Sequence, residues 1–281
     1  MDMAFRESPY TGIPEAICNK KFKRMILNER KGNMYEFITH TWNSIKGKCY
    51  HDCSYCYMKK ITPDAQPVRF VENELQVDFG INKFIFVGSS TDMFAQNVKD
   101  EWIKEVLDFC LVKTSRQAQQ ERTRFMFQTK NPQRLLQFIS HPLFDVERKQ
   151  AVICTTLETN RHYPDIMNNA PLPQDRAEAM NAIAKLGIET FVTVEPIMDF
   201  DLGEFVSLVK RCNPQQVNIG INTNANIKLP CPAIEKLINL ILLLTIFTKV
   251  HIKKNANNEN NLCKSLIHKL KKNIFFEQPV P

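Results

Sequence analysis

Short strand-like runs alternate with amphipathic helical stretches along most of this chain, and that alternation restricts its fold more than any other feature. The strand-like runs are rich in β-branched and aromatic residues and occupy residues 34–41, 83–87, 124–128, 151–157, 190–194, 216–221 and 249–253. Stretches with apolar positions at helical spacing lie at residues 100–111, 175–187, 205–212 and 234–247. Repeated strand–helix–strand units of this kind predict an α/β fold with a mainly parallel sheet.

Six or seven such units are enough to close a sheet partly or fully into a barrel. We therefore predict a partial (β/α)6-type TIM barrel with mainly parallel strands, and an open doubly wound sheet is the alternative. Asp175 is expected to cap the helix that Gly187 ends. In either architecture the side chains that do chemistry gather just beyond the carboxyl ends of the strands. The residues that follow each strand-like run are therefore the candidates for function.

Composition places the chain among globular proteins and against membrane insertion. Its 281 residues suit one large domain or two small ones, and 43% hydrophobic residues are too many for a disordered chain. The amino-terminal residues lack the apolar stretch of a signal peptide. The longest apolar run, residues 237–247, is interrupted by polar residues and is far shorter than the roughly 20 residues that span a bilayer. We expect a cytoplasmic protein without membrane contact.

The net charge of +7 comes from two segments near the ends of the chain. Residues 19–31 and residues 253–272 each contain six basic residues and one acidic residue. Such stretches are typical of phosphate binding, as in nucleic-acid partners, or of a solvated face. We predict a basic N-terminal extension at residues 1–33, a barrel at residues 34–255, and a basic helical tail at residues 256–281 that packs on or near the barrel.

Three of the nine cysteines fall within eight residues, in the loop after the first strand-like run. Cys49, Cys53 and Cys56 have the spacing C-x3-C-x2-C, and Tyr55 stands directly before the last. An odd number of cysteines without a secretion signal argues against a disulfide framework. Three thiolates this close can converge on one soft metal centre, and a [4Fe–4S] cluster held by three cysteines leaves one iron open. The alternatives are a Cys3His zinc site with His51 or His40, and a metal-free group of reduced thiols.

This motif, in the loop after the first strand of a βα barrel, resembles that of radical S-adenosylmethionine (radical SAM) enzymes. The resemblance implies that Cys49, Cys53 and Cys56 hold a [4Fe–4S] cluster whose open iron chelates the methionyl amino and carboxylate groups of SAM. One electron then cleaves SAM to methionine and a 5′-deoxyadenosyl radical, which abstracts hydrogen from a substrate. It also implies that Tyr55 lies near the adenine, and that a low-potential donor such as ferredoxin or flavodoxin supplies the electron.

Further candidates follow the later strand-like runs. In the family, a small glycine-rich motif after the second strand contacts the methionyl amino group. Gly88, Ser89 and Ser90 match that motif in place but not in letters, and Asp92 is a substitute for its missing acidic residue. Polar residues at the other strand ends suit the ribose, the methionyl carboxylate or a substrate, and they are Thr156, Glu158, Glu195, Asn222, Lys254 and residues 128–130. The alternative for each is turn or capping chemistry, with Asp92 as a helix N-cap.

The order of motifs over about residues 35–255 also resembles an uncharacterised radical SAM family of phages and mobile elements, distantly similar to spore photoproduct lyase. That similarity favours an enzyme acting on a macromolecule, with nucleic acid as the first candidate substrate. A hydrogen donor of the kind that photoproduct lyases use would be Cys154 or Cys231. A peptide or small-molecule substrate also remains open, and so do two other functions. One is a nucleic-acid-binding module with structural zinc, and the other is a degenerate barrel that keeps the cluster without the chemistry.

Overall fold

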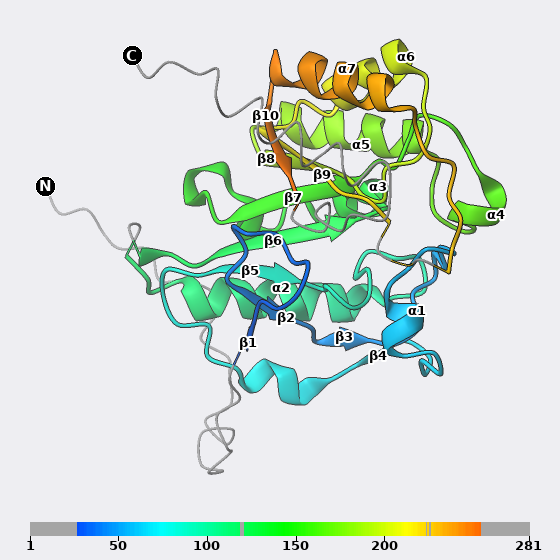
Figure 1. Ribbon diagram of the computed structural model, residues 1–281. Helices are drawn as coiled ribbons and strands as arrows, with labels where there is room; N and C mark the ends of the chain where they lie inside the picture. Colours follow the sequence, from blue (N-terminus) through cyan, green and yellow to red (C-terminus); the bar gives the residue numbers. More distant parts are fainter. Residues whose placement is uncertain (1–26, 119–120, 223, 225, 254–281) are drawn as a thin grey trace, which may run out of the picture.

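An eight-stranded sheet runs through the molecule in the order in which its strands occur in the sequence (Figure 1). The computed structural model describes residues 27–118, 121–222, 224 and 226–253. β1 (Asn28–Glu29) is antiparallel to its neighbour, and every later pair is parallel. The parallel strands are β2 (His40–Trp42), β5 (Phe84–Val87), β6 (Arg124–Thr129), β7 (Ala151–Thr156), β8 (Glu189–Val194), β9 (Gln216–Ile219) and β10 (Lys249–Ile252). This arrangement confirms the α/β class and the mainly parallel partial barrel.

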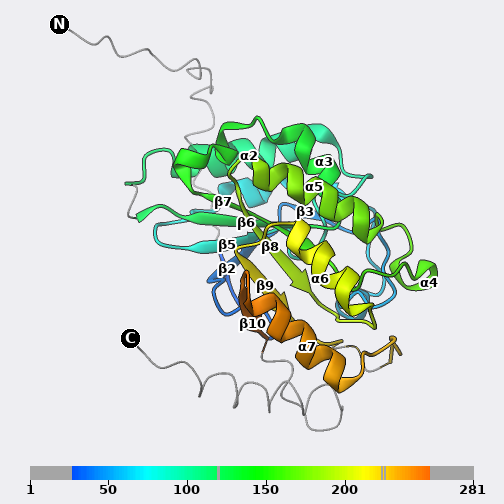
Figure 2. The same cartoon turned by 90° about the horizontal axis from the view of Figure 1, so that it is seen from above.

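Helices line the outer face of the curved sheet in chain order (Figure 2). The long ones are α2 (Asp100–Thr114), α5 (Pro173–Lys185), α6 (Leu202–Arg211) and α7 (Ile234–Thr245). Shorter pieces complete the connections: α1 (Met58–Ile61), α3 (Pro132–Leu135), α4 (Pro164–Met167), a two-stranded sheet of β3 (Ile45–Lys46) with β4 (Arg69–Phe70), and 3₁₀ turns at Glu72–Gln76, Leu136–Phe138, Pro142–Phe144 and Val146–Arg148. Within the described residues, no helix is long and apolar enough to cross a membrane.

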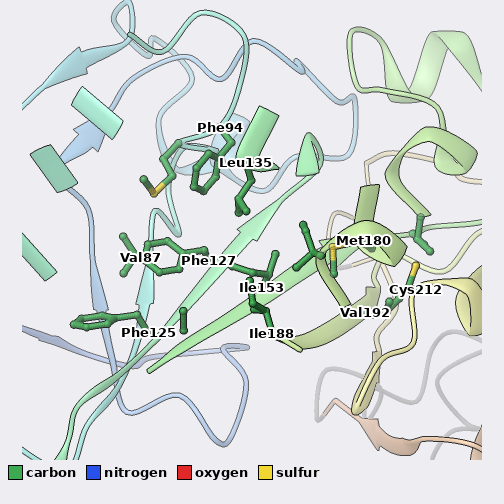
Figure 3. Packing of buried hydrophobic residues seen from close by; sticks show 14 of the residues in the cluster. Val87, Phe94, Phe125, Phe127, Leu135, Ile153, Met180, Ile188, Val192 and Cys212 are labelled. Carbon is green, nitrogen blue, oxygen red and sulfur yellow. The ribbon is translucent and has the colours of Figure 1, made fainter. Parts of the chain in front are cut away.

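The period-two alternation of strand side chains divides the buried residues into two sets. Phe125, Phe127 and Ile153 point outward and pack under the helices, against residues such as Met180 (Figure 3). The residues between them point into the barrel and form a second cluster, which contains Phe86, Met126, Val152, Cys154 and Phe191. Because the central strands are buried on both faces, their sequences are continuous apolar runs.

The first strand differs from the prediction. We expected a strand over residues 34–41, whereas β2 comprises only three residues, His40–Trp42. The preceding residues form turns that bring Tyr35 and Ile38 into the interior cluster, at 3% and 0% exposure. These apolar residues fill the inside of the barrel instead of pairing with a neighbouring strand, so they imitate a strand in composition only.

The remaining elements agree with the prediction except at their ends. Asp175 is not the N-cap of α5: that position is Leu172, Pro173 is the first helical residue, and Asp175 lies in the first turn. Gly187 follows the helix with φ +83°, as expected for a C-terminal glycine. Most of the two predicted basic segments, residues 1–33 and 256–281, lies outside the described residues, so these predictions stand as they are.

Candidate functional site

The cysteine loop leaves the carboxyl end of β2 and lies across the mouth of the barrel. β3 and β4 form its base, and Gly47 between them has φ +121°, with any Cβ only 2.5 Å from the Pro67 carbonyl oxygen. Glycine is therefore required where the loop begins. Backbone hydrogen bonds from Asp52 to Cys49 and from Cys56 to Cys53 then turn the chain twice. The result places three free thiols on one short, folded loop.

Burial favours the protonated form of two of these thiols, those of Cys49 and Cys53. Burial, with the charge of Asp92 adding to it, raises the pKa of Cys49 to about 12. Burial also raises the pKa of Cys53, which is 4% exposed. Metal binding would therefore have to release these protons.

The donor set can be compared with the metal groups that the sequence suggests. Among the residues that the structure describes, no three His, Cys, Asp or Glu side chains are gathered as ligands around one point. The number and type of donors in the loop, three thiols, suit a thiolate-bound iron cluster. The predicted zinc site needs a histidine as well: the Nε2 of His51 is bonded to Asp92 at 2.8 Å, and its buried Nδ1 has no hydrogen-bond partner. The loop therefore fits the cluster by its chemistry, through Cys49, Cys53 and Cys56.

Asp92, after β5, connects the cysteine loop to the sheet. Besides His51, its Oδ2 accepts hydrogen bonds from the Thr129 hydroxyl at 3.0 Å and the Lys130 backbone N–H at 2.8 Å. Its Oδ1 accepts from the backbone N–H of Phe94, which is the turn chemistry that the sequence offered as an alternative. Burial opposes ionisation, but the bonds from His51 and the backbone outweigh it and lower the pKa of Asp92.

Glu158, after β7, makes a second connection and is fully buried. Its Oε1 accepts from the Lys130 ammonium at 2.6 Å and from the Tyr55 hydroxyl, and its Oε2 accepts from Arg176 at 2.8 Å. Burial opposes ionisation here too, yet Arg176 and Lys130 lower the pKa of Glu158 to about 2. Tyr55, which was expected near an adenine, is 8% exposed, and its hydroxyl donates to this buried carboxylate.

The turn after β5 is organised by Asn43, which the sequence analysis missed. Gly88 has φ +77°, and the Asn43 side-chain carbonyl then accepts from the Ser90 backbone N–H at 2.9 Å and from the Ser90 and Ser89 hydroxyls. The Tyr57 hydroxyl donates to the Ser89 carbonyl. Ser89 and Ser90 therefore lie beside the cysteine loop, partly exposed, where the resemblance places a contact to the methionyl amino group.

Glu195 joins the two ends of the described chain. The ammonium of Lys253, at the end of β10, donates to its Oε2 at 2.6 Å, and Asn33, before β2, donates to its Oε1 at 3.0 Å. A Cβ at Gly220 would lie 2.7 Å from the Glu195 carboxyl carbon, so a larger residue at the neighbouring strand end would displace the Glu195 side chain. The sequence analysis named Lys254, which lies outside the described residues, and missed Lys253. Asn222 serves its own loop through bonds to the carbonyls of Asn224 and Ile227.

A line of hydroxyl and amide groups crosses the barrel interior below this site. Tyr35 donates to Gln128 at 2.8 Å and lies 2.7 Å from the Thr193 hydroxyl, and Gln128 donates to Thr156 at 3.2 Å. Cys154 lies 3.3 Å from the same Thr193 hydroxyl and is fully buried. Cys231 is disulfide-bonded, which the sequence did not predict and which leaves it no S–H to donate.

The cysteine loop borders a cavity that is open to solvent. This cavity has a volume of about 420 Å³ and is lined in part by Cys49, Tyr50, Asp52 and Asn97. The structure thus brings Cys49, Cys53, Cys56, Tyr55, Asp92 and Glu158 into one connected group, with Gly88, Ser89 and Ser90 at its edge. Thr156 and Glu195 belong to a second group, toward the barrel interior.

Sequence comparisons give no match, since no protein-family model and no curated protein sequence corresponds to this chain. Solved structures do match. A mutant spore photoproduct lyase with bound AdoMet and dinucleoside spore photoproduct has a TM-score of 0.57 and 11% identity, over 81% of this chain and 80% of that chain. The same lyase complexed with the dinucleoside spore photoproduct has a TM-score of 0.54 and 11% identity, over 79% and 78%.

The chain has the fold of spore photoproduct lyase, a mainly parallel partial barrel. A weaker match, SuiB from Streptococcus suis, has a TM-score of 0.45 and 10% identity, over 75% of this chain and 48% of that chain. At such low identity the similarity to the lyase concerns architecture alone. The activity must be argued from the residues of this chain.

Proposed function

We propose that this protein is a radical SAM enzyme. Cys49, Cys53 and Cys56 would hold a [4Fe–4S] cluster, and S-adenosylmethionine would bind beside it. The observation that carries the proposal is the C-x3-C-x2-C loop at the carboxyl end of β2, at the mouth of a barrel whose fold is similar to that of spore photoproduct lyase. When bound, the cluster supplies the electron that cleaves SAM to methionine and a 5′-deoxyadenosyl radical.

The chain's own residues would bind and orient the reactants. The three thiols lose their protons to become ligands. The backbone of the partly exposed turn Gly88–Ser90, next to the loop, would contact the methionyl amino group. Glu195, with 17% of its side chain exposed, would offer a carboxylate to a hydroxyl or amino group from the interior side. The buried Cys154 thiol would serve as hydrogen donor at the barrel floor.

The substrate class and the electron donor are also part of the proposal. We take nucleic acid as the first candidate substrate for two reasons. Residues 19–31 and 253–272 are strongly basic. At the cysteine loop, Tyr50 and Tyr57 expose 39% and 45% of their surface. Exposed aromatic rings suit stacked bases, and basic segments suit phosphates. A low-potential protein such as ferredoxin or flavodoxin would supply the electron.

Anaerobic reconstitution with iron and sulfide, followed by dithionite and SAM, tests the proposal. We expect bound iron and sulfide, and 5′-deoxyadenosine as product. Cys49→Ala, Cys53→Ala and Cys56→Ala should each abolish both, whereas Cys110→Ala, a buried thiol on α2, should retain both. A cluster that persists in any of the three variants would contradict the ligand assignment. Tight zinc without sulfide would instead support the binding-module alternative, and a stable cluster without SAM cleavage, with and without added DNA, would support the degenerate barrel.

A further inference from the structure

Two largely buried carboxylates at the strand ends form hydrogen bonds with the cysteine loop: Asp92 with His51, before Cys53, and Glu158 with Tyr55, after it. We infer that Asp92 and Glu158 are positioning residues that fix this loop before any cofactor binds, and not ligands of the cofactor. The inference rests on the proposed function only in naming what the loop positions, namely an iron–sulfur cluster. The fixation itself belongs to the chain and can be measured without the cluster.

Both carboxylate oxygens of Asp92 have hydrogen-bond partners within the protein. Four donors, one of them the His51 ring, share its two oxygens. The His51 side chain is 3% exposed and the Asp92 side chain 10% exposed. His51 lies between Cys49 and Cys53, so this bond holds the first half of the loop against the ends of β5 and β6.

The Glu158 connection holds the second half of the loop. Tyr55, between Cys53 and Cys56, donates to Oε1, which also accepts from Lys130. Arg176, fully buried on α5, occupies Oε2 and also donates to the carbonyls of Pro171 and Thr156. An incoming ligand would have to displace a charged donor from a site without water contact, which is costly. Glu158 is therefore suited to hold its neighbours in place.

Lys130 links the two connections. Its backbone N–H donates to Asp92 at 2.8 Å, its ammonium donates to Glu158 at 2.6 Å, and the ammonium lies 5.3 Å from the centre of the Tyr55 ring. The α4 segment fixes the same loop from the other side, because the Ser54 backbone donates to Ile166 and the Asn169 backbone donates to His51. Figure 1 shows α4 and α1 at the same end of the barrel. The loop is thus fixed on both sides.

Cysteine alkylation in the metal-free, full-length protein tests the inference. The test variants are Asp92→Asn and Glu158→Gln, which keep the shape and remove the charge. We expect iodoacetamide to modify Cys53 about tenfold faster in each, because local opening of the loop becomes easier. Cys110, buried on α2, reports global unfolding and should stay protected. Glu189→Gln is the matched control, since it breaks a half-exposed pair with Arg124 at the amino ends of β8 and β6, opposite the loop, and should leave the Cys53 rate unchanged.

If Cys110 also becomes reactive, the variant has unfolded, and Tyr55→Phe then decides. It removes one hydroxyl and should raise the Cys53 rate while Cys110 stays protected. Unchanged Cys53 rates in Tyr55→Phe, or in both charge variants, would overturn the inference. The same holds if reconstituted Glu158→Gln loses SAM binding while its loop remains as protected as in the wild type. A wild-type chain that assembles no cluster would contradict the proposed function, yet faster alkylation in the variants would still support the positioning role.

Discussion

Glu158 and Glu195 lie at the carboxyl ends of neighbouring strands, and each forms an ion pair with a lysine at 2.6 Å. Their surroundings differ. Glu158 is fully buried and bonds to two cations and a tyrosine. Glu195 keeps 17% of its side chain exposed, and its partners among the described residues include one lysine and one asparagine. The same residue type at equivalent places can therefore be a fixed internal anion in one case and an anion within reach of a ligand in the other.

The largest effect should come from Glu158→Ala. The substitution leaves Lys130 and the fully buried Arg176 without their counter-charge, and breaking a buried pair from one side costs about 3–5 kcal/mol of unfolding free energy. Urea unfolding of the metal-free protein measures it. As a control, Glu178→Ala removes an exposed pair with Arg211 and should cost less than about 1 kcal/mol. Equal losses in the two variants would contradict the role that we give to burial.

The pH dependence of the Glu158 contribution should come next. Because its pKa falls from an ordinary 4.5 to about 2 on folding, the stabilisation is complete above pH 4.5 and is lost as the pH falls toward 2. The difference in unfolding free energy between the wild type and Glu158→Gln should thus be constant between pH 7 and pH 5. It should shrink by on the order of 2 kcal/mol by pH 3. A difference that grows as the pH falls would have the wrong sign.

Glu195→Ala should cost less than Glu158→Ala. It removes the partner of Lys253, whose side chain is 7% exposed, but water reaches the site, and among the described residues one cation loses its counter-charge. We expect a loss of about 1–2 kcal/mol in the same urea experiment. Lys253→Met, which removes the cation instead, should give a similar loss. If Glu195→Ala destabilised the protein as much as Glu158→Ala does, the contrast between a closed and an open carboxylate would be refuted.

The sequence predicted the strands and the loop of this site better than the hydrogen bonds and ion pairs between them. The strands β5 to β10 were found from runs rich in apolar and β-branched residues, which in the central strands are a consequence of burial on both faces. The first strand was misplaced because Tyr35 and Ile38 fill the barrel interior, and packing there demands the same residue types as a strand. The position of the cysteine loop followed from its spacing, since its residues are close along the chain.

The partners of the candidate carboxylates could not be predicted in the same way. Arg176 stands on an ordinary amphipathic helix, and its pairing with Glu158 depends on how α5 packs on the sheet. Asn33 and Lys253 meet at Glu195 only because the sheet curves until its two ends approach. No local sequence pattern indicates that the two ends of the sheet approach each other. Pairings that depend on long-range packing were missed, whereas those set by neighbours along the chain were found.

The smallest predicted effect is the coupling between Glu195 and Gly220, the glycine that leaves space for its side chain. In the wild type, Gly220→Ala would put a Cβ 2.7 Å from the Glu195 carboxyl carbon and should cost about 1–3 kcal/mol. In the Glu195→Ala background that clash disappears, so the same substitution should cost about 1 kcal/mol less. Gly203→Ala is the control, because nothing lies within 4 Å of its Cβ on α6, and it should stabilise the protein slightly in both backgrounds. Additive losses at residues 220 and 195 would mean that Glu195 can move aside at no cost. Its pairing with Lys253 would then be loose, and the difference between the two carboxylates would be larger than the distances alone suggest.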